Sequence, residues 1–578
     1  IIVNKQAAPA DEKHKKIGGA VYGIYSDEAC TNLIVEMPAT DKNGASKVTF
    51  LKTQNKVYLK EITAPTGYNY NAIAYNVTLK VGKVVSVEVT DKEQLGNLTI
   101  YKEGEVLVGA SSNENGTTFQ YEKRRQKGAI YNLYAAEDIK TPDGAVVYQA
   151  GALVKENLVT GDDGSVTVTN LHLGTYRVTE IQAPENFYNA GESKTVTISY
   201  AGQTAEAAFA ETTFQNDRQK AEVSVVKQDK ETTNPLPGGI FGLYADEDIL
   251  NADGAVVVKK DTLIEKVTTN GEGKAAFTSD LPIGFGYYVK EVQAPENYLR
   301  NLEDKYSFRF SYTNDEEAKV QFAHTFSNER VNAAIVLQKK DAETNTNVPQ
   351  GDASLEQAVY GVYARKDIVH PDGKTGVIYK AGEQVGTLTT DKEGKARIEN
   401  LYLGEYFVKE ITPPVGYLAD ENEYDLVCSY EGDLVATVER DCTSPEQVKK
   451  QPFQIIKAAN NGNTDAALLE GAGFTAYLVS SLTVKEDGTY DFDSATPVVL
   501  GENGATEIFT DKKGYAVSIP LPYGTYVVRE TTTPHNYKPV DDFIVRITEH
   551  KPTEPQVWRV LLDDEFSAKL KITKQDDE

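Results

Sequence analysis

A six-residue phrase recurs five times along the chain and constrains its organisation more than any other feature. Each copy carries Glu at its second position, ends in Pro, and is followed within a few residues by an aromatic side chain. The copies occupy residues 60–65, 179–184, 290–295, 409–414 and 529–534. The repeat length is about 115 residues, which is typical of a small domain rather than of a solenoid repeat. The sequence therefore predicts five tandem domains.

The expected domain boundaries fall between these copies. We expect domains at residues 1–95, 96–220, 221–332, 333–450 and 451–567. Residues 568–578 are expected to be the first strand of a truncated sixth domain, so the chain is expected to be a fragment of a longer protein. Short runs in which apolar and polar residues alternate, bounded by turn-forming residues, predict β-strands, and no stretch predicts a long amphipathic helix. The expected fold is all-β, with tandem immunoglobulin-like sandwiches forming an elongated rod.

The composition narrows the possible functions. A formal net charge of −26 argues against nucleic acid or an anionic membrane as the main partner, because both attract basic surfaces. No apolar run is long enough to cross a bilayer. Three cysteines provide no disulfide framework, and the hairpin expected between Cys428 and Cys442 places Cys442 opposite Asn422, so we expect no bridge. An extracellular protein of this composition needs another kind of cross-link.

Strand parity indicates that the repeated glutamates point into the apolar face. Side chains alternate between the two faces of a strand, so Glu61 shares a face with Val57 and Leu59, while Lys60 between them is polar. The same holds for the other four copies. The glutamates expected to be buried are Glu61, Glu180, Glu291, Glu410 and Glu530.

A lysine in the first strand of each unit follows the same pattern. Lys5, for example, shares a face with Ile1 and Val3. The five lysines are Lys5, Lys102, Lys227, Lys339 and Lys457. Burying Lys and Glu separately is unfavourable unless the two are paired or neutralised, so we expect each lysine to lie beside the glutamate of its own unit.

The last strand of each unit supplies a third polar residue. In the first three units this residue precedes the next unit's lysine at one constant spacing, from 91 to 102, from 216 to 227 and from 328 to 339, and the residues are Asp91, Asn216 and Asn328. Asp563 has the same spacing to Lys574, although strand parity favours Asp564. In the fourth unit the expected residue is Asp441, which lies farther from the next lysine and on a polar strand face.

These three residue types together predict one reaction. Burial favours the neutral amine of Lys and the neutral acid of Glu. A neutral amine can attack the side-chain carbonyl of Asn or Asp and expel ammonia or water, with Glu as the proton shuttle. The product is an isopeptide bond between the first and last strands, formed once, so no enzymatic turnover is expected. The alternative is a buried ion pair without a cross-link.

The order of these residues resembles the Cna B-type (SpaA-like) domains of Gram-positive surface adhesins and pilins, over essentially the whole chain. The resemblance implies inverse immunoglobulin-like sandwiches, autocatalytic isopeptide bonds and a secreted protein held in the cell wall by a C-terminal anchor. Residue by residue it gives Lys5/Glu61/Asp91, Lys102/Glu180/Asn216, Lys227/Glu291/Asn328 and Lys457/Glu530/Asp563. Lys339/Glu410 has only Asp441 as its candidate third member.

The expected function is the stalk of a bacterial surface adhesin. The chain is expected to be monomeric, with host protein or glycan bound by other parts of the protein and without membrane insertion of its own. One alternative is a pilus shaft subunit, although the Tyr-Pro-Lys context of a sortase-accepting lysine does not occur. Another is a ligand-binding module, for which the insertion at residues 104–127 is the candidate loop.

No cofactor or metal is expected. The six histidines show no zinc spacing. Acidic turns such as 162–164 and 372–373 lack EF-hand spacing and are better explained as β-turns.

Overall fold

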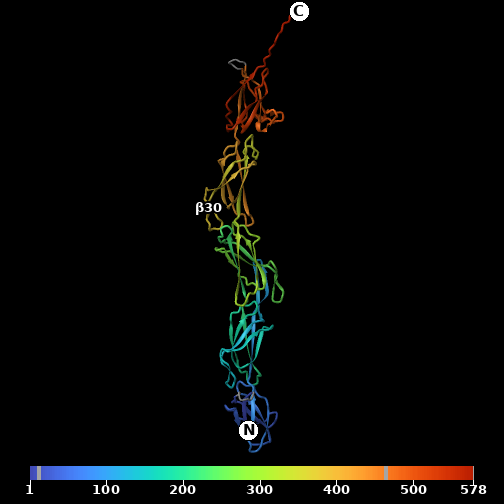
Figure 1. Cartoon of the computed structure of the whole chain (residues 1–578), viewed down its shortest axis with the longest axis vertical. Helices are drawn as coiled ribbons and strands as arrows, with labels where there is room; N and C mark the ends of the chain where they lie inside the picture. Colours follow the sequence, from blue (N-terminus) through green and yellow to red (C-terminus); the bar gives the residue numbers. More distant parts are fainter. Residues whose placement is uncertain (9–14, 461–466, 577–578) are drawn as a thin grey trace.

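The computed structural model describes residues 1–8, 15–460 and 467–576. Five β-sandwiches are stacked end to end in a rod, with the N-terminal domain at one end and the C-terminal segment extending from the other (Figure 1). Each sandwich encloses its own hydrophobic core. The expectation of an all-β rod of tandem sandwiches is confirmed.

Each domain pairs a sheet with a three-strand path, to which domain 2 adds β9 as a fourth strand, with a four-stranded sheet. In domain 1 the strands are β4(Ala45–Lys47)-β1(Ile2–Ala7)-β7(Ser86–Asp91) and β3(Leu33–Glu36)-β2(Val21–Tyr25)-β5(Lys56–Thr63)-β6(Tyr75–Thr78). In domain 2 they are β14(Ser165–Leu171)-β8(Gly96–Asn113)-β17(Ala208–Asn216), with β9(Gly116–Arg125) also paired to β8, and β13(Leu153–Val159)-β10(Ile130–Ala135)-β15(Gly174–Gln182)-β16(Ser193–Ile198).

The remaining domains repeat this arrangement. Domain 3 has β23(Lys274–Ala276)-β18(Lys220–Asp229)-β26(Lys319–Asn328) and β22(Leu263–Thr268)-β19(Ile240–Ala245)-β24(Phe285–Gln293)-β25(Lys305–Phe310). Domain 4 has β32(Lys395–Leu401)-β27(Asn332–Asp341)-β35(Thr437–Glu446) and β31(Gln384–Thr389)-β28(Val359–Ala364)-β33(Gly404–Thr412)-β34(Glu423–Cys428). Domain 5 has β42(Tyr515–Val517)-β37(Gln454–Asn460)-β46(Arg559–Asp564) and β41(Glu507–Phe509)-β38(Gly473–Leu478)-β44(Gly524–Thr532)-β45(Phe543–Ile547).

Short two-stranded pairs and 3₁₀ helices lie outside these main sheets. Two-stranded pairs are β11(Ile139–Lys140)-β12(Val146–Tyr148), β20(Ile249–Leu250)-β21(Val256–Val258), β29(Ile368–Val369)-β30(Val377–Tyr379), β36(Lys450–Gln451)-β43(Leu521–Pro522) and β39(Thr483–Val484)-β40(Tyr490–Asp491). Single-turn 3₁₀ helices are η1(Val479–Ser481) and η2(Glu502–Gly504). In the described residues no helix is long and apolar enough to cross a membrane.

The first and last strands of every domain lie side by side and run parallel. Each pair forms the centre and one edge of the three-stranded sheet. A pulling force applied to the two ends of a domain therefore acts on adjacent strands. This pairing also places the residues of the candidate site.

Hydrogen bonds join the domains at the first three junctions in one recurring way. The alanine of the repeated phrase donates its backbone N–H to a side chain of the following domain: Ala64 to Gln203 (2.8 Å), Ala183 to Asp315 (2.9 Å) and Ala294 to Asp433 (3.0 Å). At the fourth junction this position is Pro413, which has no N–H to donate. There the hydrogen bond runs in the opposite direction, because the carboxylate of Asp352 in domain 4 accepts the backbone N–H of Thr525 in domain 5 at 2.9 Å.

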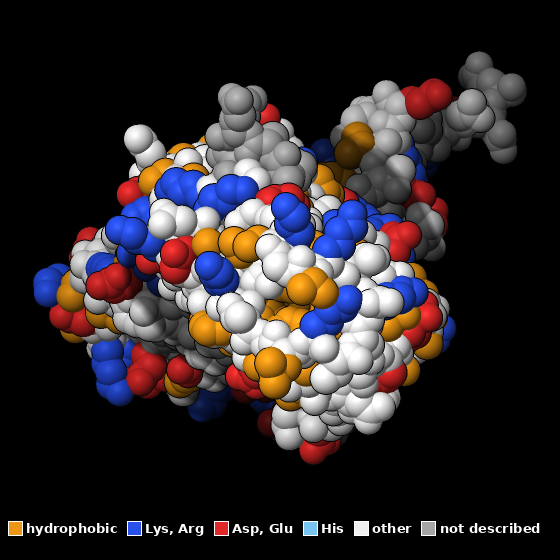
Figure 2. All heavy atoms as spheres, turned by 90° about the horizontal axis from the view of Figure 1, so that it is seen from below, with side chains coloured by type: hydrophobic (Ala, Val, Ile, Leu, Met, Phe, Trp, Pro, Cys, Tyr) orange, Lys and Arg blue, Asp and Glu red, His pale blue; other side chains and the backbone are white. Residues whose placement is uncertain are grey.

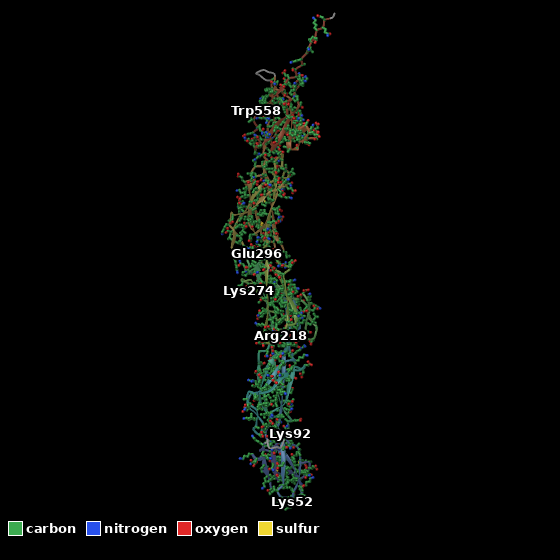
Figure 3. All side chains as sticks on the ribbon, viewed as in Figure 1. Lys52, Lys92, Arg218, Lys274, Glu296 and Trp558 are labelled. Atoms are coloured by element: carbon green, nitrogen blue, oxygen red, sulfur yellow. The ribbon has the colours of Figure 1, made fainter. Side chains whose placement is uncertain are left out.

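The insertion at residues 104–127 is not a free binding loop. It forms a hairpin in which β8 continues into β9, and the hairpin runs alongside domain 3 (Figure 1). Leu107 is buried in the core of domain 3, Thr117 donates to the backbone oxygen of Leu263 at 2.7 Å, and Tyr121 donates to that of Asp280 at 2.8 Å. Arg218, labelled midway along the rod in Figure 3, covers the ring of Tyr121. The hairpin thus braces domain 2 against domain 3.

Both ends of the rod expose apolar side chains. Figure 2 looks onto the end formed by the N-terminal domain, where hydrophobic side chains gather among lysines, and Leu51, Val81 and Val84 line an open hollow of about 400 Å³ there. At the other end, residues 566–576 contain no strand, and Leu570 and Ile572 are exposed. The sixth domain stays a prediction.

Candidate functional site: a buried lysine cluster in each domain

The parallel register of the first and last strands sets the position of the cluster. In domain 3, Lys227 is paired with Phe326, and Asn328 follows two residues later on the same face of β26. The other lysines are paired in the same way: Lys5 with Val89, Lys102 with Phe214, Lys339 with Ser444 and Lys457 with Leu561. The residue two positions beyond each partner is buried, and these residues are Asp91, Asn216, Asn328, Glu446 and Asp563.

Domain 3 shows how the three side chains meet. Lys227 on β18 is fully buried, and its Nζ lies 3.1 Å from Oε1 of Glu291 on β24. Asn328 Nδ2 donates to both carboxylate oxygens of Glu291 at 2.9 Å. Within the described part of the chain, Lys227 Nζ and Asn328 Oδ1 have no hydrogen-bond partner. Burial lowers the pKa of Lys227, which favours a neutral, nucleophilic amine.

Domain 2 repeats the arrangement with the same residue types. Lys102 Nζ donates to Glu180 Oε1 at 2.6 Å, and both side chains are buried. Burial lowers the pKa of Lys102 and raises the pKa of Glu180. Both shifts favour the uncharged pair, an amine facing a carboxylic acid, with Asn216 at the adjacent end of β17.

Domain 1 has a carboxyl group in place of the amide. Lys5 Nζ donates to Glu61 Oε1 at 2.9 Å and to the hydroxyl of Tyr22 at 2.6 Å, and it also contacts Asp91. Burial raises the pKa of Asp91 to about 7, although the charge of Lys5 opposes the shift. A carboxyl with this pKa holds a proton part of the time at neutral pH, and only the protonated form can lose water.

Domain 5 resembles domain 1 and settles a choice between two neighbours. Lys457 Nζ donates to Glu530 Oε2 at 2.6 Å and contacts Asp563, and all three side chains are buried. Burial raises the pKa of Asp563 to about 6. Asp564 is exposed and accepts a hydrogen bond from Asn460. The structure therefore places Asp563 at the lysine, as its spacing to Lys574 indicates and against strand parity.

In domain 4 the expectation for Asp441 is wrong. Asp441 is exposed and lies opposite Val336, away from Ser444, the partner of Lys339. Glu446 is buried in its place and contacts Lys339 Nζ. Lys339 also donates to Glu410 Oε1 at 2.9 Å, and burial lowers its pKa to about 8. The correction follows from register, because Glu446 and not Asp441 lies two positions beyond Ser444.

A signal for Glu446 is present in the sequence. The step from position 446 to Lys457 equals the step from 91 to 102, from 216 to 227 and from 328 to 339. The predicted reaction calls for an Asn or an Asp as the third member, and a Glu at this distance does not meet that expectation. The repeat therefore determines the position of the third cluster residue but not its residue type.

Backbone N–H groups hold the repeated glutamates in place. The second carboxylate oxygen accepts the N–H of the residue ten positions later in four domains: Asn71, Asn301, Asp420 and Val540. In domain 2 the corresponding oxygen of Glu180 has no partner among the described residues. The first oxygen remains directed at the lysine in domains 1, 3 and 4, so these glutamates are oriented before any reaction.

An aromatic ring closes each cluster on one side. A cation–π contact joins lysine and ring in domains 1, 3, 4 and 5, with rings from Tyr22, Phe241, Tyr360 and Phe474. In domain 2, Tyr131 donates to Glu180 at 3.5 Å. The rings exclude water from the lysine, which strengthens the desolvation that moves the pKa values.

The cysteines contribute nothing to this chemistry. Cys30, Cys428 and Cys442 are all free, so the expectation of no bridge between Cys428 and Cys442 is confirmed. Burial raises the pKa of Cys442 to about 12, and a thiol with that pKa is unreactive at neutral pH.

Comparison with known proteins identifies the domains. The family model described as SpaA, a prealbumin-like fold domain, matches residues 4–93, 100–213, 221–325, 331–441 and 452–559. A collagen adhesin of Staphylococcus aureus is 28% identical over 217 residues, which are 35% of this chain and 16% of the adhesin. The TIE protein of Bacillus anthracis aligns with 77% of this chain and 74% of its own length, at 20% identity and a TM-score of 0.43. BcpA, the major pilin subunit of Bacillus cereus, aligns with 61% of this chain and 99% of its own length, at 14% identity and a TM-score of 0.23.

Proposed function

The chain belongs to the family of SpaA prealbumin-like fold domains, and we propose that its five domains form a covalently cross-linked stalk on the surface of a Gram-positive bacterium. The observation that carries this proposal is the buried Lys–Glu–acceptor cluster, which recurs at the same register in all five domains. Each cluster joins the first and last strands, through which tension enters and leaves a domain.

The reaction proposed for domain 3 needs no external reagent. The neutral amine of Lys227 attacks the side-chain carbonyl carbon of Asn328 and forms a C–N bond. Glu291 takes a proton from the attacking nitrogen and returns it to the departing amino group, which leaves as ammonia. Hydrogen bonds from Asn328 Nδ2 to both Glu291 oxygens support this proton route. Lys102, Glu180 and Asn216 react in the same way.

In the domains with a carboxyl acceptor the leaving group is water. Lys5 condenses with Asp91, and Lys457 with Asp563. In domain 4 we assign the acceptor role to Glu446, so that Lys339 forms a bond to a carboxyl one methylene longer. The repeated glutamates, Glu61, Glu530 and Glu410, carry the proton in each case.

Such bonds explain how the rod withstands load without disulfides. A bond between adjacent terminal strands transmits force past the hydrogen-bonded body of the domain. It also closes a loop of about 80–120 residues, which stabilises the folded state by about 4–5 kcal/mol in the chain-entropy model. Unlike a disulfide, an amide cannot be reduced. Host-ligand binding and wall anchoring are assigned to other parts of the protein.

Intact mass of the purified chain tests the proposal. Each bond to Asn removes about 17 Da and each bond to Asp or Glu about 18 Da from the mass of the unmodified chain. Five bonds give a deficit of about 88 Da, and four bonds without domain 4 give about 70 Da. A deficit near 70 Da means that one bond to a carboxyl acceptor is missing, and it rejects the assignment of Glu446 when the branched peptide of Lys339 with Glu446 is the one not found. An unmodified mass rejects the cross-linked stalk. Branched peptides containing Lys227 with Asn328, or Lys339 with Glu446, locate the bonds after digestion.

A further inference from the structure

The junction between domains 3 and 4 buries a histidine among carboxylates from both domains. Asp229 ends β18 of domain 3, whereas His370 and Asp372 belong to the turn between β29 and β30 of domain 4. Figure 1 labels β30 beside this junction. The three side chains are 1%, 3% and 5% exposed, and one candidate ligand atom from each lies within 4.8 Å of the others.

One ring nitrogen of His370 lacks a partner. Nε2 is buried and has no hydrogen bond within the described residues. It lies 4.0 Å from Oδ2 of Asp229 and 4.0 Å from Oε2 of Glu231. A buried nitrogen without a partner is unfavourable, and here it faces two carboxylates at a separation too long for hydrogen bonds.

The other ring nitrogen has two neighbours that correspond to two tautomers. Nδ1 lies 3.2 Å from Oδ2 of Asp372 and also 3.2 Å from the backbone nitrogen of Asp372. If Nδ1 accepts from the backbone, Nε2 carries a proton with no acceptor in reach. If Nδ1 donates to Asp372, Nε2 presents a lone pair toward Asp229 and Glu231. The second tautomer is the carboxylate–histidine–metal arrangement, in which a carboxylate orients the ring behind a ligating nitrogen.

The surrounding side chains fix the carboxylates in advance. Asp229 Oδ2 accepts from the hydroxyl of Tyr298 at 2.7 Å. Asp372 Oδ2 accepts from Thr232 at 3.0 Å and from Asn234 at 2.9 Å, both from domain 3. The hydrogen bonds therefore hold the two domains in register around His370 without any ion.

We propose that the buried His370 Nε2 and Asp229 Oδ2, joined by the exposed carboxylate of Glu231 beside Arg330, bind a divalent transition metal of the zinc class, which locks domain 3 to domain 4. One imidazole and two carboxylates suit zinc and its neighbours, whereas calcium prefers all-oxygen sites. Donors each about 2.1 Å from one zinc ion lie at most about 4.2 Å apart, and Nε2 lies 4.0 Å from both carboxylate oxygens. Binding requires the exposed Glu231 side chain to turn from Arg330 toward the ion. A hollow of about 280 Å³, lined by Asp229, Glu231 and Arg330 among others, opens beside the carboxylates and provides a path for the ion.

Within the described residues, the junctions of domains 1 and 2 and of domains 4 and 5 lack this feature. At the junction of domains 4 and 5, Asp341 takes the place of Asp229 and accepts from Tyr417 at 3.0 Å, but the amide of Gln350 occupies its other side. At the junction of domains 1 and 2, His172 Nδ1 is already paired with Glu93 at 2.7 Å. Among the described residues, Asp229, His370 and the orienting Asp372 form the one group of three His, Cys, Asp or Glu side chains whose candidate ligand atoms lie within 4.8 Å of one another.

Calorimetric titration of the complete, untagged chain with zinc chloride after removal of metals tests the inference. We expect one saturable site whose affinity falls at least tenfold in His370→Gln and in Asp229→Asn, and is unchanged in His172→Gln. Cobalt titration gives a second readout, since ligation by His370 produces a visible absorption band that His370→Gln removes. Small-angle scattering of each variant checks that the rod keeps its length. The absence of a saturable site, or a site that survives His370→Gln in a chain of normal length, overturns the inference.

Discussion

Domains 3 and 4 share strand order, register, lysine and glutamate, but they differ in the residue two positions beyond the lysine's partner. In domain 3 this residue is Asn328, which donates to Glu291, and the amine of Lys227 keeps its ion pair with Glu291 but has no hydrogen-bond partner among the described residues. In domain 4 it is Glu446, and the amine of Lys339 is shared among two carboxylates and the hydroxyl of Tyr360. The backbone register therefore determines where the acceptor lies, whereas the identity of its side chain determines whether ammonia or water leaves.

The largest effect is expected from removing the acceptor of domain 3. Asn328→Ala leaves the Lys227–Glu291 pair in place but prevents the bond. We expect the mass deficit to fall by about 17 Da, the domain to lose about 4–5 kcal/mol of stability, and single-molecule pulling to show an added extension of up to about 360 Å from the released loop of about 100 residues. The other four domains are internal controls in the same molecule. A variant that resists force as the native chain does contradicts the mechanical role of the bond.

The same test in domain 4 distinguishes two acidic residues of one strand. Glu446→Ala is expected to reduce the deficit by about 18 Da and to release the loop that starts at Lys339. Asp441→Ala, a substitution on the exposed face of β35, is expected to leave both the mass deficit and the pulling trace unchanged. Loss of the bond in Asp441→Ala would reverse our correction.

Strand periodicity predicted the buried lysines and glutamates correctly, although it favoured Asp564 over Asp563 in domain 5. Parity identified buried Lys227 and Glu291 because one face of each strand is apolar, and the constant spacing to the next lysine identified Asn328. Sequence reasoning failed within domain 4, where the acceptor is Glu446 rather than Asp441, and it could not predict contacts between domains. His370 and Asp229 belong to different repeats of the sequence and meet only across a junction, so no local spacing links them.

The hairpin of domain 2 was missed for a related reason. Its two loop residues are Glu114 and Asn115, followed by Gly116 at the start of β9, and residues 118–122 alternate in polarity. The sequence therefore allowed a hairpin, but the surface that buries Leu107 belongs to domain 3. An isolated two-stranded hairpin is marginal in water, and the neighbouring domain provides the stability that local propensity does not.

A smaller effect is expected on the pH dependence of stability, which should differ between a domain with a carboxyl acceptor and a domain with an amide acceptor. In Glu61→Gln, which blocks the bond of domain 1, Asp91 keeps a titratable carboxyl whose pKa burial raises. The folded state then holds a proton that the unfolded chain releases near pH 4, so stability is lost as pH rises from about 4 through 7. When the pH is lowered from 8 to 5, we expect the free energy of unfolding of domain 1 in this variant to rise by about 1–3 kcal/mol, measured by calorimetry. Glu291→Gln, whose acceptor is an amide, is the matched control and should lack this gain.

The smallest effect concerns the ring that covers the lysine. Tyr360 donates to Glu446 at 2.9 Å and accepts from Lys339 at 2.8 Å, whereas domain 3 has Phe241 in the equivalent position. Tyr360→Phe makes domain 4 resemble domain 3 and leaves the buried Glu446 side-chain oxygen, an amide oxygen once the bond to Lys339 has formed, with one donor fewer, at a cost of about 1 kcal/mol. Amide hydrogen exchange in β28 should therefore become about fivefold faster.

Tyr363→Phe is the control for this change, because Tyr363 lies on the same strand and stacks on Phe407 outside the cluster. It should leave exchange in β28 unchanged. The reverse substitution, Phe241→Tyr, supplies Lys227 with a hydroxyl partner and should slow exchange in β19. Equal exchange rates in Tyr360→Phe and the native chain would mean that the hydroxyl contributes nothing, and that the difference between domains 3 and 4 lies wholly in the acceptor.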